Sequence, residues 1–237
     1  MSSFRPAFWP TVMTVPAVLA MIALGSWQVY RLDWKLNLIA QMEAQLAAAP
    51  VPLPAGALDP EAWDYRRVTV SGSFDHAKEV HMVSHSHRGN LGYHIYTPFY
   101  REDGGGVVLV NRGWVPSDNK DPATRAEGQI AGPVVVDGIA RKSWGQASFV
   151  PDNDPAQNVW FFPDLSAIAE TMAIEPPTVF VAAGPAANPG GYPLGGQTKV
   201  TLRNNHLSYA ITWYGLAVAL VVIYILWHRS RRKRAAA

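Results

Sequence analysis

The sequence contains no cysteine and has few charged residues for its length. Without cysteine, no disulfide, thiolate metal site or cysteine nucleophile can form. Copper chemistry based on paired cysteines is excluded, and histidine, methionine and carboxylates remain as metal ligands. Charged residues make up 16% of the chain, against roughly a quarter in ordinary soluble domains. The deficit lies at the two ends, which are apolar, while the middle has an ordinary composition.

Familiar catalytic motifs are also missing. The chain has no nucleophile elbow, Walker loop, zincin helix or Gly-rich dinucleotide loop. The segment EDGGG at 102–106 lacks the lysine and the helix that phosphate binding needs. The net charge of +2 is carried by the basic C-terminal tail, so it gives no reason to expect a nucleic-acid partner. We therefore expect a protein that is not an enzyme.

Two long apolar runs stand near the ends of the chain. The second, 207–227, has no charged residue over roughly twenty positions, which is the length of a membrane-spanning helix. The basic tail at 229–237 follows it and is expected in the cytoplasm by the positive-inside rule. We predict transmembrane helices at 7–30 and 206–228, with both termini cytoplasmic and the middle of the chain periplasmic.

The first apolar run has an alternative interpretation as a secretory signal peptide cleaved near residues 23–25. Its length favours an uncleaved anchor, and good helix formers continue the helix to about residue 48. On that helix Trp27, Arg31, Trp34 and Leu38 form one stripe. An interfacial aromatic belt with a snorkelling arginine explains the stripe as well as a ligand site does.

The middle of the chain is expected to be rich in β-structure. The proline-rich segment 49–64 predicts an extended linker, and the domain is expected at 65–203. Short β-like runs lie at 66–74, 79–85, 93–100, 107–111, 134–141, 178–182 and 197–202. EDGGG predicts a hairpin turn, and Asp164 predicts the start of one helix at 164–173. The predicted fold class is membrane α+β: two transmembrane helices flanking a compact, mainly antiparallel β periplasmic domain with one helix.

Histidines gather in one stretch, since five of the seven lie between His76 and His94. On a strand, His81, His85 and His87 share a face because side chains alternate. Imidazoles grouped in this way could bind Cu²⁺ or Zn²⁺. Histidine spacing alone is nonspecific, however, and the run ends in a turn-like sequence. We therefore favour solvent-facing polar side chains over a metal site.

Arg112 and Trp114 follow a buried-looking strand. The pair could stack, bind an anion or dock a partner protein. The alternative is that Trp114 closes the end of the core while Arg112 pairs with a carboxylate. The sequence leaves both interpretations open.

His206 stands at the outer end of the second apolar run. A titratable ring at this depth is costly without a partner, which makes it a candidate functional residue. Its helical face carries Tyr209, Ala210, Trp213 and Ala217. A flat macrocycle could lie against this face with its iron on the imidazole. The small residues equally suit ordinary helix packing.

Several motifs, taken together in order and spacing, resemble those of the SURF1 family. They are LGxWQxxRxxWK at 24–35, GYHxxTP at 92–98, LVNRGWVP at 109–116, FxPxNDPxxNxW at 149–160 and NHLxYAxTW at 205–213. The resemblance covers the chain from the first apolar run to the last. The histidine-rich stretch 81–87 and the Gly-rich loop 184–196 depart from the family pattern.

The resemblance implies a cytochrome c oxidase assembly factor in respiratory chain biogenesis. It implies haem a as the cofactor, held transiently and delivered to oxidase subunit I, with haem a synthase and the lipid bilayer as further partners and no nucleic acid. The lack of a transit-like segment suggests a bacterial inner-membrane member. A cofactor-free membrane-tethered scaffold is the main alternative, and a copper carrier using His81, His85 and His87 is a third possibility.

The resemblance also implies individual residue roles. His206 matches the family's proposed iron ligand. Tyr209 and Trp213 are expected to line the haem face, with a companion contact from Trp27. Arg31 is expected to neutralise a haem propionate through a charge-assisted hydrogen bond.

Overall fold

The computed structural model describes residues 6–87, 89–198 and 204–235. The chain divides into two compact units. One is helical and comprises Met1–Gln41 with Thr201–Ala237, and the other is β-rich and comprises Met42–Val200. Two long apolar helices at the ends of the chain thus flank a mainly β domain, as the sequence predicted.

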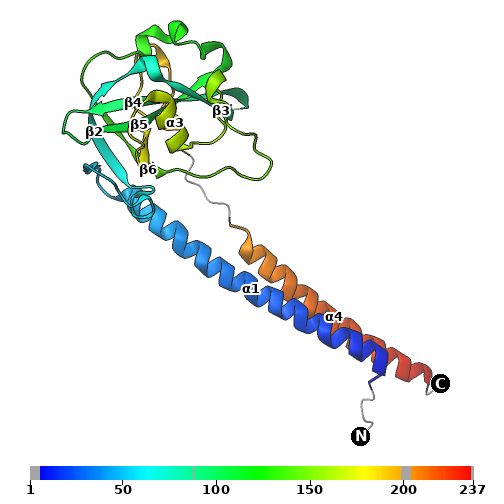
Figure 1. Ribbon diagram of the computed structural model, residues 1–237. Coiled ribbons are helices and arrows are strands. Elements are labelled where there is room, and N and C mark those ends of the chain that lie inside the picture. Colours follow the sequence, from blue (N-terminus) through cyan, green and yellow to red (C-terminus); the bar gives the residue numbers. More distant parts are fainter. Residues whose placement is uncertain (1–5, 88, 199–203, 236–237) are drawn as a thin grey trace. The chain divides into compact units, whose positions relative to one another are not determined.

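The helical unit is an antiparallel pair formed by α1, Phe8–Ala47, and α4, His206–Ala235 (Figure 1). The basic segment expected as a separate tail continues α4 as far as Ala235. Close packing of the pair depends on Gly25, where an added Cβ would lie 2.9 Å from the Tyr214 ring. Small residues allow backbones in such a pair to approach closely.

Seven strands form one sheet in the order β1-β2-β6-β7-β5-β4-β3, and a further pairing joins β2 to β4. That pairing closes β2, β6, β7, β5 and β4 into a ring. The strands are β1 Val51–Pro52, β2 Arg67–Phe74, β3 Val80–His87, β4 Asn90–Arg101, β5 Val107–Pro116, β6 Val134–Lys142 and β7 Val179–Ala183. Pairing is antiparallel except for β1 with β2 and β5 with β7, so the mainly antiparallel prediction is confirmed.

The shorter helices connect and cover this sheet. They are α2 Pro60–Trp63, α3 Leu165–Met172 and the 3-10 turns His76–Lys78, Ser117–Asn119, Pro122–Gly128, Pro155–Gln157 and Pro189–Gly191. Asp164 caps α3, as predicted, because its carboxylate accepts hydrogen bonds from two backbone N–H groups in the first turn. The EDGGG segment joins β4 to β5, which confirms the predicted hairpin.

Two apolar cores hold the β unit together. One lies inside the ring, with Val68, Phe99 and Val110 among its buried members. The other lies between the outer face of the sheet and α3, and includes Trp160 and Phe180. Side chains alternate across a strand, so β4, β5 and β7 contribute to both cores, whereas the buried residues of β2 and β6 belong to the first core alone.

The predicted linker at 49–64 is not a plain linker. It contains β1, which pairs in parallel with β2, and the short helix α2. Leu53 is buried in the ring core, so apolar burial draws the segment onto the sheet despite its prolines. Of the expected strand at 197–202, residues 197 and 198 are not in a strand, and the rest lies outside the described residues.

Candidate functional site

His206 is the first residue of α4, and its ring contacts the other helix of the pair. Its Nδ1–H donates to Gln28 Oε1 at 2.6 Å. Gln28 is 9% exposed, so the acceptor is held within the pair. When the ring is neutral, a hydrogen bond donated by Nδ1 selects the tautomer in which Nε2 carries the lone pair. No other described residue forms a hydrogen bond with Nε2 of His206.

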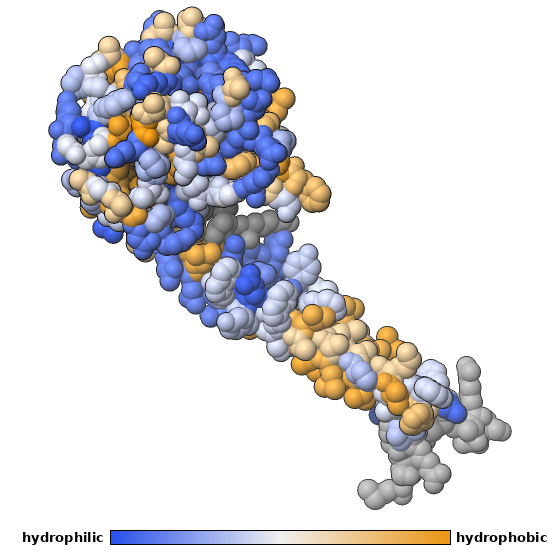
Figure 2. All heavy atoms as spheres, in the orientation of Figure 1, coloured by the Kyte–Doolittle hydropathy of each residue, from blue (hydrophilic) through white to orange (hydrophobic). Residues whose placement is uncertain are grey.

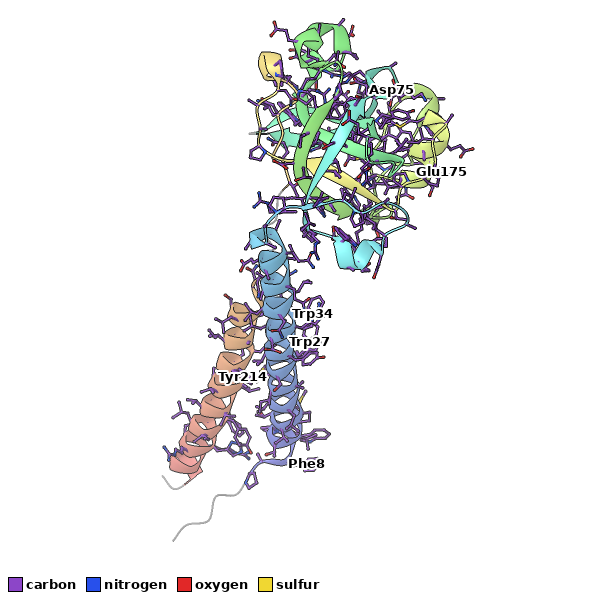
Figure 3. All side chains as sticks on the ribbon, turned by 90° about the vertical axis from the view of Figure 1, so that its left-hand side faces the viewer. Phe8, Trp27, Trp34, Asp75, Glu175 and Tyr214 are labelled. Carbon is purple, nitrogen blue, oxygen red and sulfur yellow. The ribbon has the colours of Figure 1, made fainter. Side chains whose placement is uncertain are left out.

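Sequence reasoning missed Gln28 as the partner of His206. The neighbouring residue, Trp27, was predicted to contact haem, which is a different role. The side chain of Trp27 is 53% exposed and forms part of the outer surface of α1, where Figure 3 labels it. An uncharged amide inside an apolar run is itself a signal, because a polar group at such a depth needs a partner. That signal could have identified Gln28.

The helical face predicted around His206 divides into two parts. Ala210 and Ala217 are buried, as expected for small residues that let helices approach. Trp213 is half-buried, and Tyr209 is 55% exposed. Aromatic surface is therefore present on the turns that follow His206, beside the packed alanines.

Arg31 lies one helical turn from Gln28. Its guanidinium stacks over the Trp34 ring at 4.2 Å from the centroid, which is the arrangement expected for an arginine in an aromatic belt. The cation has no carboxylate partner among the described residues. An imidazole, aromatic surface and a cation are the kinds of group that suit a haem.

Polar contacts between α1 and α4 occur toward both ends of the pair. At the end opposite to His206, His228 Nε2 accepts from Ala7 N–H at 3.0 Å, and the Thr11 and Tyr224 hydroxyls lie 2.6 Å apart. At 1.5 Å per residue, the interval from His206 to His228 is about 33 Å. A bilayer's hydrocarbon core is about 30 Å thick.

Length and composition make both helices candidates for crossing a membrane, over Phe8–Ala47 and His206–Arg231. In Figure 2, apolar residues form a band along the helix pair with hydrophilic residues at its two ends. The surface of the β unit in the same view mixes hydrophilic and apolar residues.

Arg112 and Trp114 are buried, so the prediction that their side chains form a partner surface is wrong. Arg112 donates to Gly128 O and contacts His76 Nδ1 at 3.3 Å, with its guanidinium 4.8 Å from the Phe74 ring centroid. No carboxylate pairs with it among the described residues, which also contradicts the expected ion pair. Burial lowers the pKa of Arg112 to about 10.

A bulge explains the burial of Arg112. Ile95 pairs with Gly113 and Tyr96 with Asn111, so Arg112 is an extra residue on β5. Gly113 has a φ of 126°, and an added Cβ there would lie 2.0 Å from Leu194 O. The bulge interrupts the regular pairing of β4 with β5 at Arg112.

His81 is buried, which overturns its prediction as a solvent-facing residue. Its Nε2–H donates to Glu79 Oε1 at 2.8 Å, and the same carboxylate receives two hydrogen bonds from Arg125. The side chains of His85 and His87 lie outside the described residues. Among the described residues, no group of three potential metal ligands occurs.

Comparison with known proteins gives a consistent result. The model of the SURF1 family matches residues 15–218. Surfeit locus protein 1 of Homo sapiens is 44% identical over 211 residues, which cover 83% of this chain and 70% of that protein. The Xenopus tropicalis protein of the same name is 41% identical, covering 86% and 71% of the two chains.

A more distant relative extends the match to nearly the whole sequence. The SURF1-like protein of Monosiga brevicollis is 38% identical over 237 residues, which cover 96% of this chain and 89% of that protein. The match to the family model includes most of α1, the β unit and the first part of α4, where His206 lies. This chain belongs to the SURF1 family.

Proposed function

We propose that this protein is a membrane-anchored assembly factor for a haem–copper terminal oxidase, cytochrome c oxidase. It holds haem a at the outer leaflet through His206 and assists its insertion into oxidase subunit I, after receipt from haem a synthase. The role is one of binding and transfer, without catalysis. Haem a supplies the redox chemistry of the oxidase that receives it.

The observation that carries the proposal is the hydrogen bond between His206 and Gln28. An iron ligand must offer an unprotonated nitrogen, and the second ring nitrogen of such histidines almost always donates to a neighbouring acceptor. Here Nδ1–H is given to Gln28 Oε1, and Nε2 keeps its lone pair. A single imidazole suits a carrier that has to release its cargo.

Other residues of the helix pair would position the bound group. Trp213 and Tyr209 supply flat apolar surface on the turns after His206, and Trp27 supplies it on α1. Arg31 is placed one turn beyond Gln28 for a propionate, since a guanidinium forms strong charge-assisted bonds with carboxylates. The stacking of Arg31 on Trp34 limits its motion.

The proposed location is a bacterial inner membrane, with the β unit in the periplasm and both termini in the cytoplasm. The absence of cysteine makes this testable with single introduced thiols. In intact spheroplasts, an impermeant maleimide should label Phe149→Cys, at a fully exposed position of the β unit, and should not label Ser230→Cys. Labelling of both positions, or only of Ser230→Cys, would reject this topology.

The haem proposal is tested by absorbance spectra of protein purified from cells that make haem a. We expect a haem a spectrum in the wild type and at least a tenfold loss of bound haem in His206→Ala. His228→Ala is the matched control, because it removes a buried histidine from the same helix at the opposite end. Equal haem content in wild type and His206→Ala would reject the ligand role.

The role of Gln28 is tested on the haem-free protein as well. The ¹⁵N shifts of His206 should show a protonated Nδ1 and an unprotonated Nε2, and Gln28→Leu should remove that preference. In the haem-loaded protein, Gln28→Glu should lower the midpoint potential, because a carboxylate acceptor raises the basicity of the ring. A wild-type ring protonated on Nε2 would contradict the proposed geometry.

A further inference from the structure

A cavity of about 210 Å³ lies in the β unit, against the core of the ring. Its apolar walls include side chains that pack against that core, namely Phe74, Val134, Val136 and Ala183. Arg112, the extra residue at the bulge of β5, also lines the cavity. The other polar side chains of the lining are those of Asn188 and Asp137. An apolar pocket with a few polar groups is the usual composition of a small-molecule site.

The buried charges of the β unit do not balance. Among its described residues, the buried side chains include one carboxylate, Glu79, and two guanidinium groups, Arg112 and Arg125. Glu79 already accepts two hydrogen bonds from Arg125. Because buried charges in proteins are normally paired, Arg112 is left as a buried cation without a counter-ion of its own.

Neutral groups compensate Arg112 only in part. Its Nη2 donates to Gly128 O and to Asn188 Oδ1 at 3.4 Å, and its Nη1 contacts His76 Nδ1 at 3.3 Å. A guanidinium has five N–H groups, so Nε–H and one N–H of Nη1 have no acceptor among the described residues. Nε is not one of the enclosed side-chain atoms that lack a partner. This N–H group therefore keeps accessible surface and is available to a ligand in the cavity.

The charges at the cavity favour a ligand with a single negative group. Arg112 keeps its charge at neutral pH, because burial lowers its pKa only to about 10, and it would repel a cation. The charges that shift the pKa of Arg112 are those of Glu79 and Arg125. Asp137 is not among them, and its exposed carboxylate accepts from the Thr69 hydroxyl at 2.6 Å. A second negative group on the ligand would be repelled by Asp137.

We propose that this cavity binds a small monocarboxylic acid with a short aliphatic chain. The carboxylate accepts a charge-assisted hydrogen bond from Nε–H of Arg112, and the chain lies against Val134, Val136 and Ala183. The bound acid supplies the counter-ion that the buried cation lacks. The site does not use His206 and does not depend on the proposed haem binding.

The test compares a carboxylate with its neutral and doubly charged analogues. Pentanoate is titrated into the full-length protein in detergent, with pentanamide as the neutral analogue and glutarate as the dicarboxylate. The Nε–H signal of Arg112 is followed by ¹⁵N NMR and is assigned by its loss in Arg112→Lys. We expect a saturable shift with pentanoate and at least about tenfold weaker binding of both analogues, because only the monoanion adds one charge-assisted bond without a second charge. Equal binding of pentanoate and either analogue, or no saturable shift, would overturn the proposal.

Variants at exposed positions locate the carboxylate without changing the buried network. Val135 lines the cavity and is 66% exposed. At low salt, where exposed charges are least screened, Val135→Asp should weaken pentanoate binding about threefold. Val135→Asn is the matched neutral control and should leave the affinity unchanged.

Asp137→Asn should have the opposite effect. It removes the repulsive carboxylate from the lining, so pentanoate should bind more tightly and the preference over glutarate should shrink. Arg112→Gln should abolish the binding of pentanoate, measured by calorimetry. If that variant does not fold, the two exposed positions still decide the question. Unchanged affinity for pentanoate in both Val135→Asp and Asp137→Asn would place the acid elsewhere.

Discussion

The two units of this protein bury polar groups in different ways. The helix pair joins neutral partners, as in the contacts of Gln28 with His206 and of Ser26 with Tyr214. No ion pair occurs among its described residues. The β unit instead buries charge, with the Glu79 carboxylate enclosed between Arg125 and His81.

The difference follows from the surroundings that each unit requires. Placing a charged group within a bilayer costs far more free energy than placing a neutral hydrogen-bonding group there. Hydrogen bonds between neutral side chains are therefore the favourable way to join two membrane helices. In a water-exposed β domain, an ion pair can be buried if hydrogen bonds saturate both partners. The chain therefore separates its buried charges from the segments that we assign to the membrane.

The largest expected effect is the loss of the buried carboxylate. Glu79→Gln leaves the Arg125 cation without its counter-ion, which should cost about 3–5 kcal/mol of unfolding free energy. Urea unfolding followed by Trp fluorescence in detergent measures it. Glu61→Gln is the control, because the Glu61 pair with Lys142 is exposed and should contribute less than about 1 kcal/mol. Similar losses in both variants would mean that the Glu79 network is not a special feature of the β unit.

The next largest expected effect is a loss of stability of the β unit as the pH falls. Burial lowers the pKa of His94 to about 4 from its ordinary 6.5, so the unfolded chain binds the extra proton first as pH falls. The folded β unit should lose stability between about pH 6.5 and pH 4, by on the order of 3 kcal/mol from this group alone. Burial also lowers the pKa of His76, which acts in the same direction.

Glu79 adds a further loss at lower pH. Burial alone would raise its pKa, but hydrogen bonds from His81 and Arg125 outweigh that effect and hold the pKa below its ordinary value. Its contribution therefore disappears as pH falls through the folded pKa. The His94 share is isolated by His94→Phe, whose stability should fall less over the window from pH 6.5 to pH 4. Parallel curves for wild type and variant would contradict a neutral buried His94.

The smallest expected effect lies in the helix pair. Tyr214→Phe removes the contact between the Tyr214 hydroxyl and Ser26 Oγ, which lie 3.0 Å apart. A neutral interhelical hydrogen bond contributes about 0.6 kcal/mol on average, so unfolding of the pair in bicelles should change by roughly that amount. A loss of unfolding free energy above about 2 kcal/mol would show that this one neutral hydrogen bond stabilises the helix pair nearly as much as the buried Glu79 network stabilises the β unit. The proposed difference between the two units would then be wrong.

Local pattern was enough for most elements of the fold. The apolar runs predicted both long helices, alternation predicted most strands of the sheet, and Asp164 predicted the start of α3. Each of these depends on residues within a few turns of one another. The segment 49–64 was mispredicted because pairing of β1 with β2 is not encoded in its own composition.

Among the site residues, too, some could be identified from local sequence and others could not. His206 could be chosen from the sequence because a lone imidazole at the mouth of an apolar run is unusual. Its acceptor Gln28 lies 178 positions away along the chain, and nothing local to either residue pairs them. Arg112 was a candidate for a partner surface because it follows a buried-looking strand together with Trp114, and the bulge that makes Arg112 an extra residue on β5 is not evident from that local sequence.

The sequence by itself determined the order of elements, the two membrane-length helices and the family. The tertiary structure alone decided which polar groups meet, including Gln28 with His206 and Glu79 with Arg125. The physical reason is that secondary structure follows from short-range periodicity and burial, whereas the pairing of a polar side chain depends on which distant segment packs against it.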